Sequence, residues 1–189
     1  PGRISGFTFG MRLQADPTTS ANFVEWGCSN STDEYMFQLV GTRLNIIRRS
    51  VVDLPNSLLE RQGIEPSSQQ LKYPVGLANE NELFETVIER RYWNGDRLDG
   101  TGPSGYILSF EDVTMYKIEF SWYGAIGAKF YAYVPAGNGE ARWVLLHTFI
   151  IENGMDGPVM KNPDMKFKYL LYSINTARIQ QPLYIYKYG

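Results

Sequence analysis

The stretch that decides the fold is residues 110–151, FEDVTMYKIEFSWYGAIGAKFYAYVPAGNGEARWVLLHTFII. At 116–122, large apolar residues alternate with Lys, Glu and Ser, the period-2 pattern of a strand with one buried face and one wet face. Turns that contain glycine separate this strand from apolar runs at 128–134 and 142–151. The 142–151 run is apolar on both sides, so we expect it to be a central strand. Residues 110–151 therefore predict consecutive antiparallel strands.

The rest of the chain carries similar patterns. Further strands separated by turn residues are predicted at 7–13, 23–26, 35–40, 44–49, 83–93 and 167–174. One segment has helix punctuation, with Asn56 or Ser57 as N-cap and a stop at Gly63. The polar region 65–81 is expected to be a mobile surface connection. We predict an all-β fold, a two-sheet antiparallel sandwich of jelly-roll or concanavalin-like type with at most one or two short helices.

The composition narrows the class of protein. The length of 189 residues favours a single β-sandwich domain over 1–189, and the start at Pro1 together with the tyrosine-rich end suggests a fragment of a longer chain. Cys28 is the only cysteine, so no internal disulfide can form, and we expect an inert thiol. The 18 basic and 20 acidic residues nearly balance, so we expect no nucleic-acid partner. The sequence has neither a signal-peptide pattern nor a long apolar run, and we expect no membrane insertion.

Catalytic motifs are scarce. His147 is the only histidine, and it lies in the 142–151 strand without obvious partners, so a hydrogen-bonded sheet histidine is the preferred interpretation. The sequence has no nucleophile elbow, no phosphate-binding loop and no zinc-protease motif. We therefore expect a protein that is not an enzyme and has no catalytic residue.

Glu80, Glu82 and Glu85 are the exception that we considered. An E-x-D-x-x-E pattern on a strand places the two carboxyls of some sandwich-type glucanases on one face, but here the middle residue is Glu. A retaining glycosidase needs carboxyls about 5 Å apart, whereas positions 82 and 85 point to opposite faces of a regular strand unless a bulge intervenes. Glycoside hydrolysis is the third and weakest hypothesis.

Oxygen-bearing side chains in the glycine-rich loop after residue 93 form a weak calcium candidate. Asn94, Asp96 and Asp99 offer hard oxygen ligands, but their spacing departs from that of an EF-hand loop and no suitably placed glutamate follows. Such residues in glycine loops usually accept hydrogen bonds from local backbone. We expect no required cofactor, with calcium as the one candidate.

Aromatic residues at strand ends supply the candidate binding sites. Trp26, Trp93 and Tyr123 lie near predicted strand ends, where an exposed ring could stack on a sugar. Most aromatic residues in such a chain should be core. At the C-terminal end, an alternating set predicts a strand with one aromatic face, suited to an interface or a sheet edge. Its members are Tyr184, Tyr186 and Tyr188.

Several short sequence motifs, called phrases below, are distinctive. They are Phe7-x-Phe9-Gly10, Glu25-Trp26-Gly27, Ile47-Arg48-Arg49-Ser50, Trp93-Asn94-Gly95-Asp96, Leu98-Asp99-Gly100, Phe120-x-Trp122-Tyr123-Gly124-Ala125-x-Gly127 and the late His147. Together these phrases resemble a domain of virion structural proteins of tailed bacteriophages, closest to a baseplate wedge or tail protein of contractile-tailed, especially marine, phages. The resemblance spans roughly residues 5–160.

The resemblance implies a lectin-like or laminin-G-like sandwich within a large virion polypeptide, made in the host cytoplasm and located in the tail or baseplate. The 93–105 loop would be a signature of the fold, and no catalytic residue transfers. The leading hypothesis is a structural domain that contacts other virion proteins. The alternative is a carbohydrate-binding module on the same scaffold.

Overall fold

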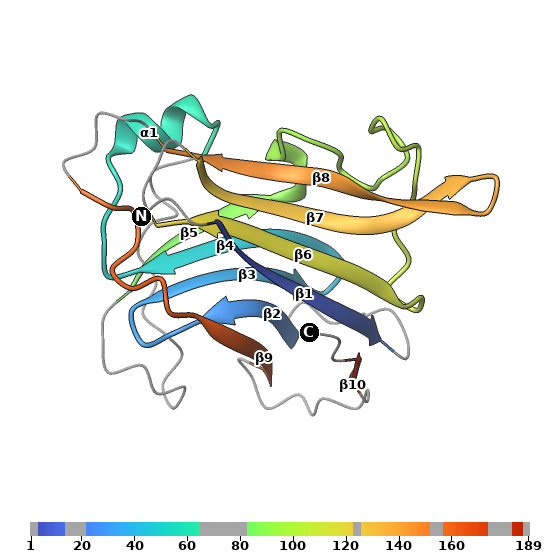
Figure 1. Cartoon of the computed structure of the whole chain (residues 1–189), viewed down its shortest axis with the longest axis horizontal. Coiled ribbons are helices and arrows are strands. Elements are labelled where there is room, and N and C mark those ends of the chain that lie inside the picture. Colours follow the sequence, from blue (N-terminus) through green and yellow to red (C-terminus); the bar gives the residue numbers. More distant parts are fainter. Residues whose placement is uncertain are drawn as a thin grey trace.

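The computed structural model describes residues 4–13, 22–64, 83–122, 126–151, 157–173 and 183–186, which form two antiparallel sheets that pack as a sandwich (Figure 1). Across sheet A the order is β10 (Leu183–Tyr186), β1 (Ile4–Leu13), β6 (Thr114–Ser121), β7 (Ile126–Gly137) and β8 (Glu140–Ile150). Across sheet B the order is β5 (Phe84–Glu89), β4 (Arg43–Ser50), β3 (Asp33–Val40), β2 (Asn22–Ser29) and β9 (Lys166–Ser173). The predicted two-sheet antiparallel sandwich is confirmed.

Tight turns join neighbouring strands where the sequence predicted breaks. Gly41, at φ 59°, lies in the turn between β3 and β4, and Asn138 and Gly139, at φ 53° and 77°, lie in the turn between β7 and β8. A left-handed backbone is easily adopted by glycine and tolerated by asparagine, so these residues fit the turns. Glycine also lets β2 and β3 approach each other, because a Cβ on Gly27 would lie 2.2 Å from the carbonyl oxygen of Tyr35.

The core between the sheets is built from aromatic rings. The Trp26 ring stacks on Phe37 with ring centroids 5.5 Å apart, and both rings contact Tyr116 from the opposite sheet. Phe130 of sheet A meets Phe37 edge-on at 5.4 Å. Burying a large apolar side chain contributes about 1.5–3 kcal/mol, so this layer is a main source of stability. Cys28 is also fully buried, and burial raises the pKa of its thiol, in agreement with the predicted inert residue.

Two short helices are described, and neither has the length to span a membrane. Helix α1 (Asn56–Arg61) ends before Gly63 as predicted, but its N-cap is Pro55, so the prediction of Asn56 or Ser57 as the cap is wrong by one or two residues. The predicted strand over 83–93 is shorter than expected. It ends at Glu89 and passes into the 3-10 helix η2 (Arg90–Tyr92).

Strand β8 contradicts one prediction. It was expected to be central, but it is an edge strand of sheet A and pairs only with β7 in the sheet order. A loop, and not another strand, covers the outer edge of its second half. In Figure 1 the β7–β8 hairpin projects beyond the other strands of the sandwich.

The other edge of sheet A is formed by β10, which pairs with β1 alone in the sheet order. This places Tyr184 and Tyr186 in an edge strand, as the alternating tyrosines predicted. Tyr188, the polar region 65–81 and the candidates Glu80, Glu82 and Tyr123 lie outside the described residues.

Candidate functional site

The two tryptophans predicted as stacking platforms are buried. The exposed fraction of Trp26 is 0% and that of Trp93 is 3%, and the Trp93 indole N–H donates to the carbonyl of Ile88 at 3.2 Å. A sugar ring cannot reach either side chain, so their assignment as a glycan site is wrong. Trp26 lies within β2 and Trp93 directly follows η2, so neither lies at a strand end as expected, and both belong to the core.

The three calcium candidates form hydrogen bonds that hold the loop in place. Asp96 is buried, and its two carboxylate oxygens accept hydrogen bonds from the backbone N–H groups of Leu98 at 2.8 Å and Ser104 at 2.6 Å. Asp99 is exposed and accepts from Thr101. Within the described ranges, no group of three or more His, Cys, Asp or Glu side chains is arranged to hold a metal ion. The carboxylates therefore act as acceptors that fold the loop.

The same loop covers half of the outer edge of β8. The side chain of Asn94 exchanges two hydrogen bonds of 2.8 Å with the backbone of Thr148. The backbone N–H groups of Gly95 and Asp96 donate to the carbonyls of Leu146 and Leu145, both at 2.9 Å. A Cβ on Gly95 would lie 2.4 Å from the Leu145 oxygen, so glycine is required for this approach. The loop thus acts as a short extra strand.

His147 has a structural position beside this loop. It is fully buried, and its Nδ1 accepts a hydrogen bond from the backbone N–H of Asn94 at 3.2 Å. Its Nε2 is buried and finds no partner among the described residues. Burial lowers the pKa of His147 to about 4, so the ring is neutral near pH 7. The prediction of a hydrogen-bonded sheet histidine is confirmed.

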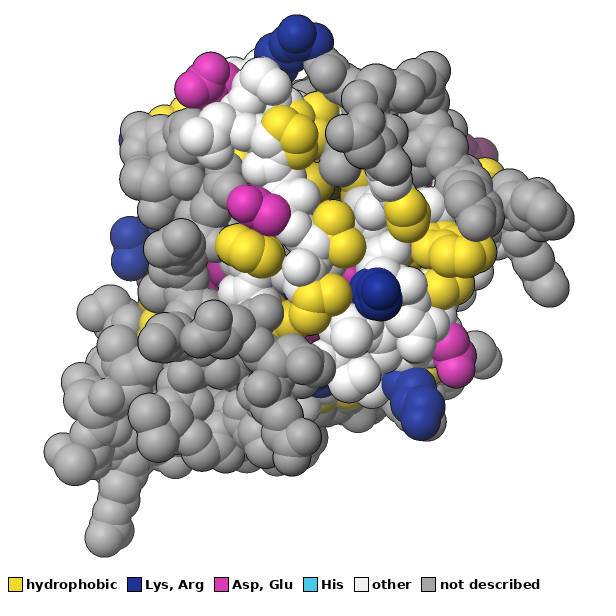
Figure 2. Space-filling model, turned by 90° about the vertical axis from the view of Figure 1, so that its left-hand side faces the viewer, with side chains coloured by type: hydrophobic (Ala, Val, Ile, Leu, Met, Phe, Trp, Pro, Cys, Tyr) yellow, Lys and Arg dark blue, Asp and Glu magenta, His cyan; other side chains and the backbone are white. Residues whose placement is uncertain are grey.

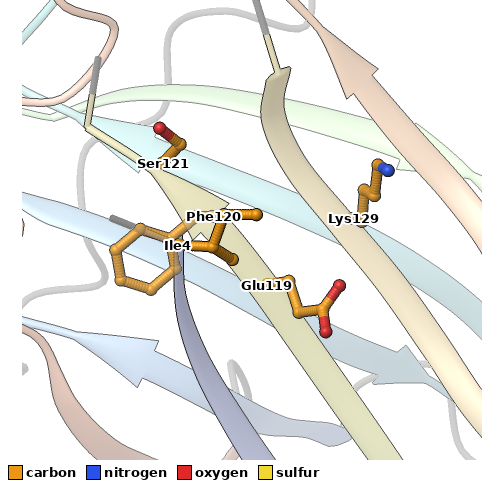
Figure 3. Close-up of a pocket in the computed structure, with 5 residues that line it drawn as sticks. All are labelled: Ile4, Glu119, Phe120, Ser121 and Lys129. Atoms are coloured by element: carbon orange, nitrogen blue, oxygen red, sulfur yellow. The ribbon is translucent and has the colours of Figure 1, made fainter. Parts of the chain in front are cut away.

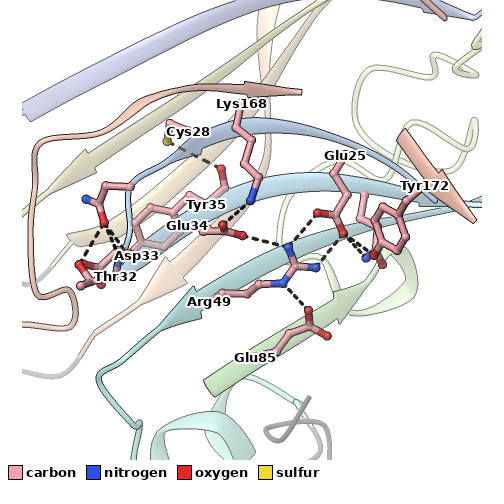
Figure 4. Close-up of polar contacts among 12 residues, drawn as sticks. Glu25, Cys28, Thr32, Asp33, Glu34, Tyr35, Arg49, Glu85, Lys168 and Tyr172 are labelled. Carbon is pink, nitrogen blue, oxygen red and sulfur yellow. Dashed lines mark hydrogen bonds and ion pairs between the residues drawn. The ribbon is translucent and has the colours of Figure 1, made fainter. Parts of the chain in front are cut away.

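A cluster of buried charges lies on the face of sheet B that points away from the core (Figure 4). The Arg49 guanidinium binds Glu25 in a bidentate manner at 2.7 and 2.8 Å, Glu34 at 2.9 Å and Glu85 at 2.5 Å. Lys168 donates to Glu34 at 2.5 Å. We call these five residues the Arg49 cluster. Three carboxylates thus face two cations in a region from which water is largely excluded.

The pKa shifts in the Arg49 cluster differ in sign. Burial disfavours the charged form of Glu25, but the hydrogen bonds and charge of Arg49 outweigh it, so the pKa of Glu25 is lowered. Burial dominates at Glu85, and its pKa is raised. Such a split is typical of acid and base pairs in glycosidases. Here, however, every carboxylate binds a cation and none is more than 5% exposed, so the cluster offers no free carboxyl to a sugar.

The outer face of sheet A is different, because it carries exposed aromatic rings. Tyr131 and Tyr133 of β7 and Trp143 of β8 point to this face, with Tyr133 42% and Trp143 37% exposed. Tyr133 lies directly opposite Trp143 in the sheet, with ring centroids 5.2 Å apart at a tilt of 53°. The Lys117 ammonium of β6 lies 4.3 Å from the Tyr131 centroid and 5.0 Å from that of Trp143. We call these four residues the aromatic cluster.

Glu119 links the aromatic cluster to β6. Its carboxylate accepts a hydrogen bond of 2.9 Å from Lys117 and another from the Tyr131 hydroxyl. Burial and the adjacent Glu119 charge together raise the pKa of Tyr131 to about 12, so the phenol remains a donor. Next to these groups lies a pocket of about 30 Å³, lined by Ile4, Phe120, Ser121, Glu119 and Lys129 (Figure 3). A pocket of this volume holds about one water molecule and no larger ligand.

The sequence contains a signal for the aromatic cluster. In β7 the buried positions are small or apolar, whereas the alternate positions hold Lys129, Tyr131 and Tyr133. Three amphipathic side chains on the solvent-facing side of a strand indicate an interaction surface. Trp143 was missed because its strand was expected to be central.

On the end of the sandwich near α1, the described residues do not concentrate charge. Figure 2 shows their hydrophobic side chains in small groups among polar atoms, with basic and acidic residues spread around them. These residues therefore form no concentrated field for a highly charged partner. The aromatic cluster on the outer face of sheet A, with its exposed Tyr133 and Trp143 rings, is the stronger candidate for a binding surface.

Comparison of the chain with protein-family models, with curated proteins and with solved structures finds no match in any of the three.

Proposed function

We propose that this chain is a non-catalytic structural domain of a phage virion, in the tail or baseplate, and that it acts through protein–protein contacts. The observation that carries the proposal is the aromatic cluster on the outer face of sheet A, next to the point where the β7–β8 hairpin projects beyond the other strands (Figure 1). Apolar surface exposed in this way favours burial against another protein. Tyr, Trp and Arg are also the residues most often found at the energetic centres of interfaces, and Arg142 lies next to Trp143.

The absence of a reactive arrangement among the described residues supports the same proposal. The carboxylates of the Arg49 cluster are neutralised and buried, and His147 lies beside a backbone N–H and not beside a nucleophile. The 93–105 loop stabilises a strand edge. The resemblance of several phrases to virion structural proteins of tailed phages is the reason for placing these contacts in a tail or baseplate.

The test is incorporation into particles. Mass spectrometry of purified virions of the encoding phage should recover peptides of this chain. A variant carrying Tyr133→Ala and Trp143→Ala should be incorporated several-fold less than the wild type. The matched control is Val113→Ala, which truncates an exposed apolar residue outside the cluster. Purified virions without the chain would contradict the proposal.

Glycan binding by the aromatic cluster is the second candidate, favoured by the two exposed rings of Tyr133 and Trp143 on one face. It ranks lower for two reasons. The rings are tilted by 53° and do not form a flat platform, and the Lys117 ammonium lies over the faces of Tyr131 and Trp143. If the domain binds glycan, a glycan array should give signals that Trp143→Ala removes. A flat array with the wild type would rule this function out.

A further inference from the structure

The outer edge of β8 has a covered half and an open half. The residues from Leu145 to Ile150 bond to the loop at 94–96 and to the Gln62 side chain, which accepts from the Ile150 N–H at 2.9 Å. Over Glu140–Val144, by contrast, no described residue outside β7 forms a hydrogen bond with the strand backbone. An unpaired strand edge is a template for pairing with another strand. The open edge is therefore a candidate interaction surface.

The sheet register indicates which backbone groups the open edge offers. In an antiparallel pair, alternate residues direct both N–H and C=O away from the neighbouring strand. Thr148 and Ile150 do so in the covered half, since their N–H groups bond to Asn94 and Gln62. A one-residue register shift between Phe130 and Tyr131 changes this alternation. In the open half, the backbone N–H and C=O groups of Ala141 and Trp143 therefore point away from β7.

We propose that the open edge of β8 pairs with the same edge of a second copy of this chain, antiparallel, about a two-fold axis at Ala141. The inference rests on the proposed function, because it specifies one of the protein–protein contacts of the assembly. Pairing would join the two copies of sheet A into one continuous sheet. A two-fold contact of this kind is self-complementary, as a symmetric dimer requires.

The charges on the open edge select this register. With the axis at Ala141, Glu140 lies opposite Arg142 of the second copy, and Arg142 lies opposite Glu140 of the second copy. With the axis at Arg142, which the backbone pattern would also allow, the two Arg142 side chains face each other. Opposite charges across a strand pair stabilise it and like charges destabilise it. The charge pattern therefore favours the axis at Ala141.

The length of the open edge fits the same register. The paired segment ends in each copy near Gly139, where the chain turns into β7. On the other side it ends before Leu145, whose carbonyl is already bonded to the loop. Trp143 lies opposite Gly139 of the second copy, where the exposed indole meets no competing side chain. The paired segment therefore lies between the turn at Asn138–Gly139 and the loop-bonded Leu145.

A charge exchange tests the register on the full 189-residue chain. By sedimentation velocity, the wild type should form dimers at high micromolar concentration. Glu140→Arg alone and Arg142→Glu alone should each weaken the dimer by about tenfold or more, because two attractive pairs become repulsive. An equimolar mixture of the two variants should dimerise again, since each variant complements the other, and the double exchange should also dimerise. A monomeric wild type, or a mixture that stays monomeric, would overturn the inference.

Cysteine cross-linking checks the axis independently. Ala141→Cys should form an intermolecular disulfide, because facing Cα atoms in a hydrogen-bonded antiparallel pair are about 5.5 Å apart, within disulfide range. Native Cys28 is fully buried and serves as an internal blank. Cross-linking of Arg142→Cys in preference to Ala141→Cys would refute the register. Virion incorporation is measured separately, so dimers without incorporation would count against the proposed function alone, and incorporation without dimers would count against the edge pairing alone.

Discussion

The outer faces of the two sheets use charged and aromatic residues in opposite ways. On sheet B, Arg49 is buried and binds three carboxylates, so each charge has a fixed partner. On sheet A, Lys117 is partly exposed, forms one ion pair and otherwise lies over aromatic rings. The difference shows that a concentration of charged residues in this protein does not by itself indicate an accessible surface. The buried charges bind one another within sheet B, whereas the rings of Tyr133 and Trp143 on sheet A are exposed.

Removing the central cation of each face should give the largest contrast. Arg49→Met leaves three buried carboxylates with one lysine, and breaking a buried ion pair costs about 3–5 kcal/mol. Lys117→Met removes a partly exposed pair and should cost about 1 kcal/mol or less. Urea unfolding of both variants measures the difference. Equal losses would show that the two faces do not differ as described.

Sheet A also has a buried ionisable group, His147. Here the neutral form, and not a charged form, should stabilise the fold and give it a pH dependence. The pKa of His147 is lowered to about 4, so the unfolded chain binds the proton first as the pH falls below 6.5. The neutral ring contributes stability that is fully present above pH 6.5 and lost as the pH falls to about 4, by about 3 kcal/mol. His147→Asn keeps an acceptor for the Asn94 N–H but cannot titrate. The variant should therefore show a shallower fall in unfolding free energy over this range, and an identical slope would contradict the assignment.

Two isosteric substitutions sharpen the description of the Arg49 cluster. The pKa of Glu25 is lowered, so its ionised form stabilises the fold above its ordinary pKa and the effect is lost in acid. Glu25→Gln should thus cost about 1–3 kcal/mol at pH 7. The pKa of Glu85 is raised, so ionisation there is unfavourable and Glu85→Gln should cost less or be neutral. Thermal unfolding at pH 7 ranks the two, and the reverse order would refute the assigned shifts.

The smallest stability effect is expected at the aromatic cluster. Trp143 is 37% exposed, so Trp143→Ala should change the unfolding free energy by about 1 kcal/mol or less. Trp26→Ala, in the core, should cost about 3–5 kcal/mol and is the matched control. Chemical unfolding of the pair measures this. A large loss at Trp143 would mean that the ring belongs to the core and not to a surface kept for a partner.

The sequence predicted the class of fold because alternation is a local signal. The alternation at 116–122 and the glycine turns that follow it are sufficient for a hairpin, and the structure confirms them. The position of β8 could not be predicted in the same way. The edge of its second half is covered by residues 94–96, about fifty positions away in the sequence, and no local pattern contains this contact.

The candidate site was predicted poorly for a related reason. Trp26 and Trp93 were selected by their nearness to strand ends, but exposure depends on which face packs on the other sheet. Glu85 was noticed as a carboxylate, yet its partner Arg49, which also binds Glu25, is brought beside it only by the register of sheet B. Both the burial of the tryptophans and the partners of Glu85 depend on how the strands pair and pack. Composition and spacing do not give this information.

Because the tryptophans differ in burial, their fluorescence can distinguish the β7–β8 hairpin from the rest of the protein. Trp26 and Trp93 are buried and Trp122 is partly buried, whereas Trp143 is exposed on the projecting hairpin. A soluble quencher such as acrylamide should therefore reach the Trp143 indole first and remove the red-shifted part of the intrinsic emission. Any partner that covers the hairpin should shield this fraction. The unlabelled protein thus carries its own fluorescent reporter of occupancy at the surface where contact is proposed.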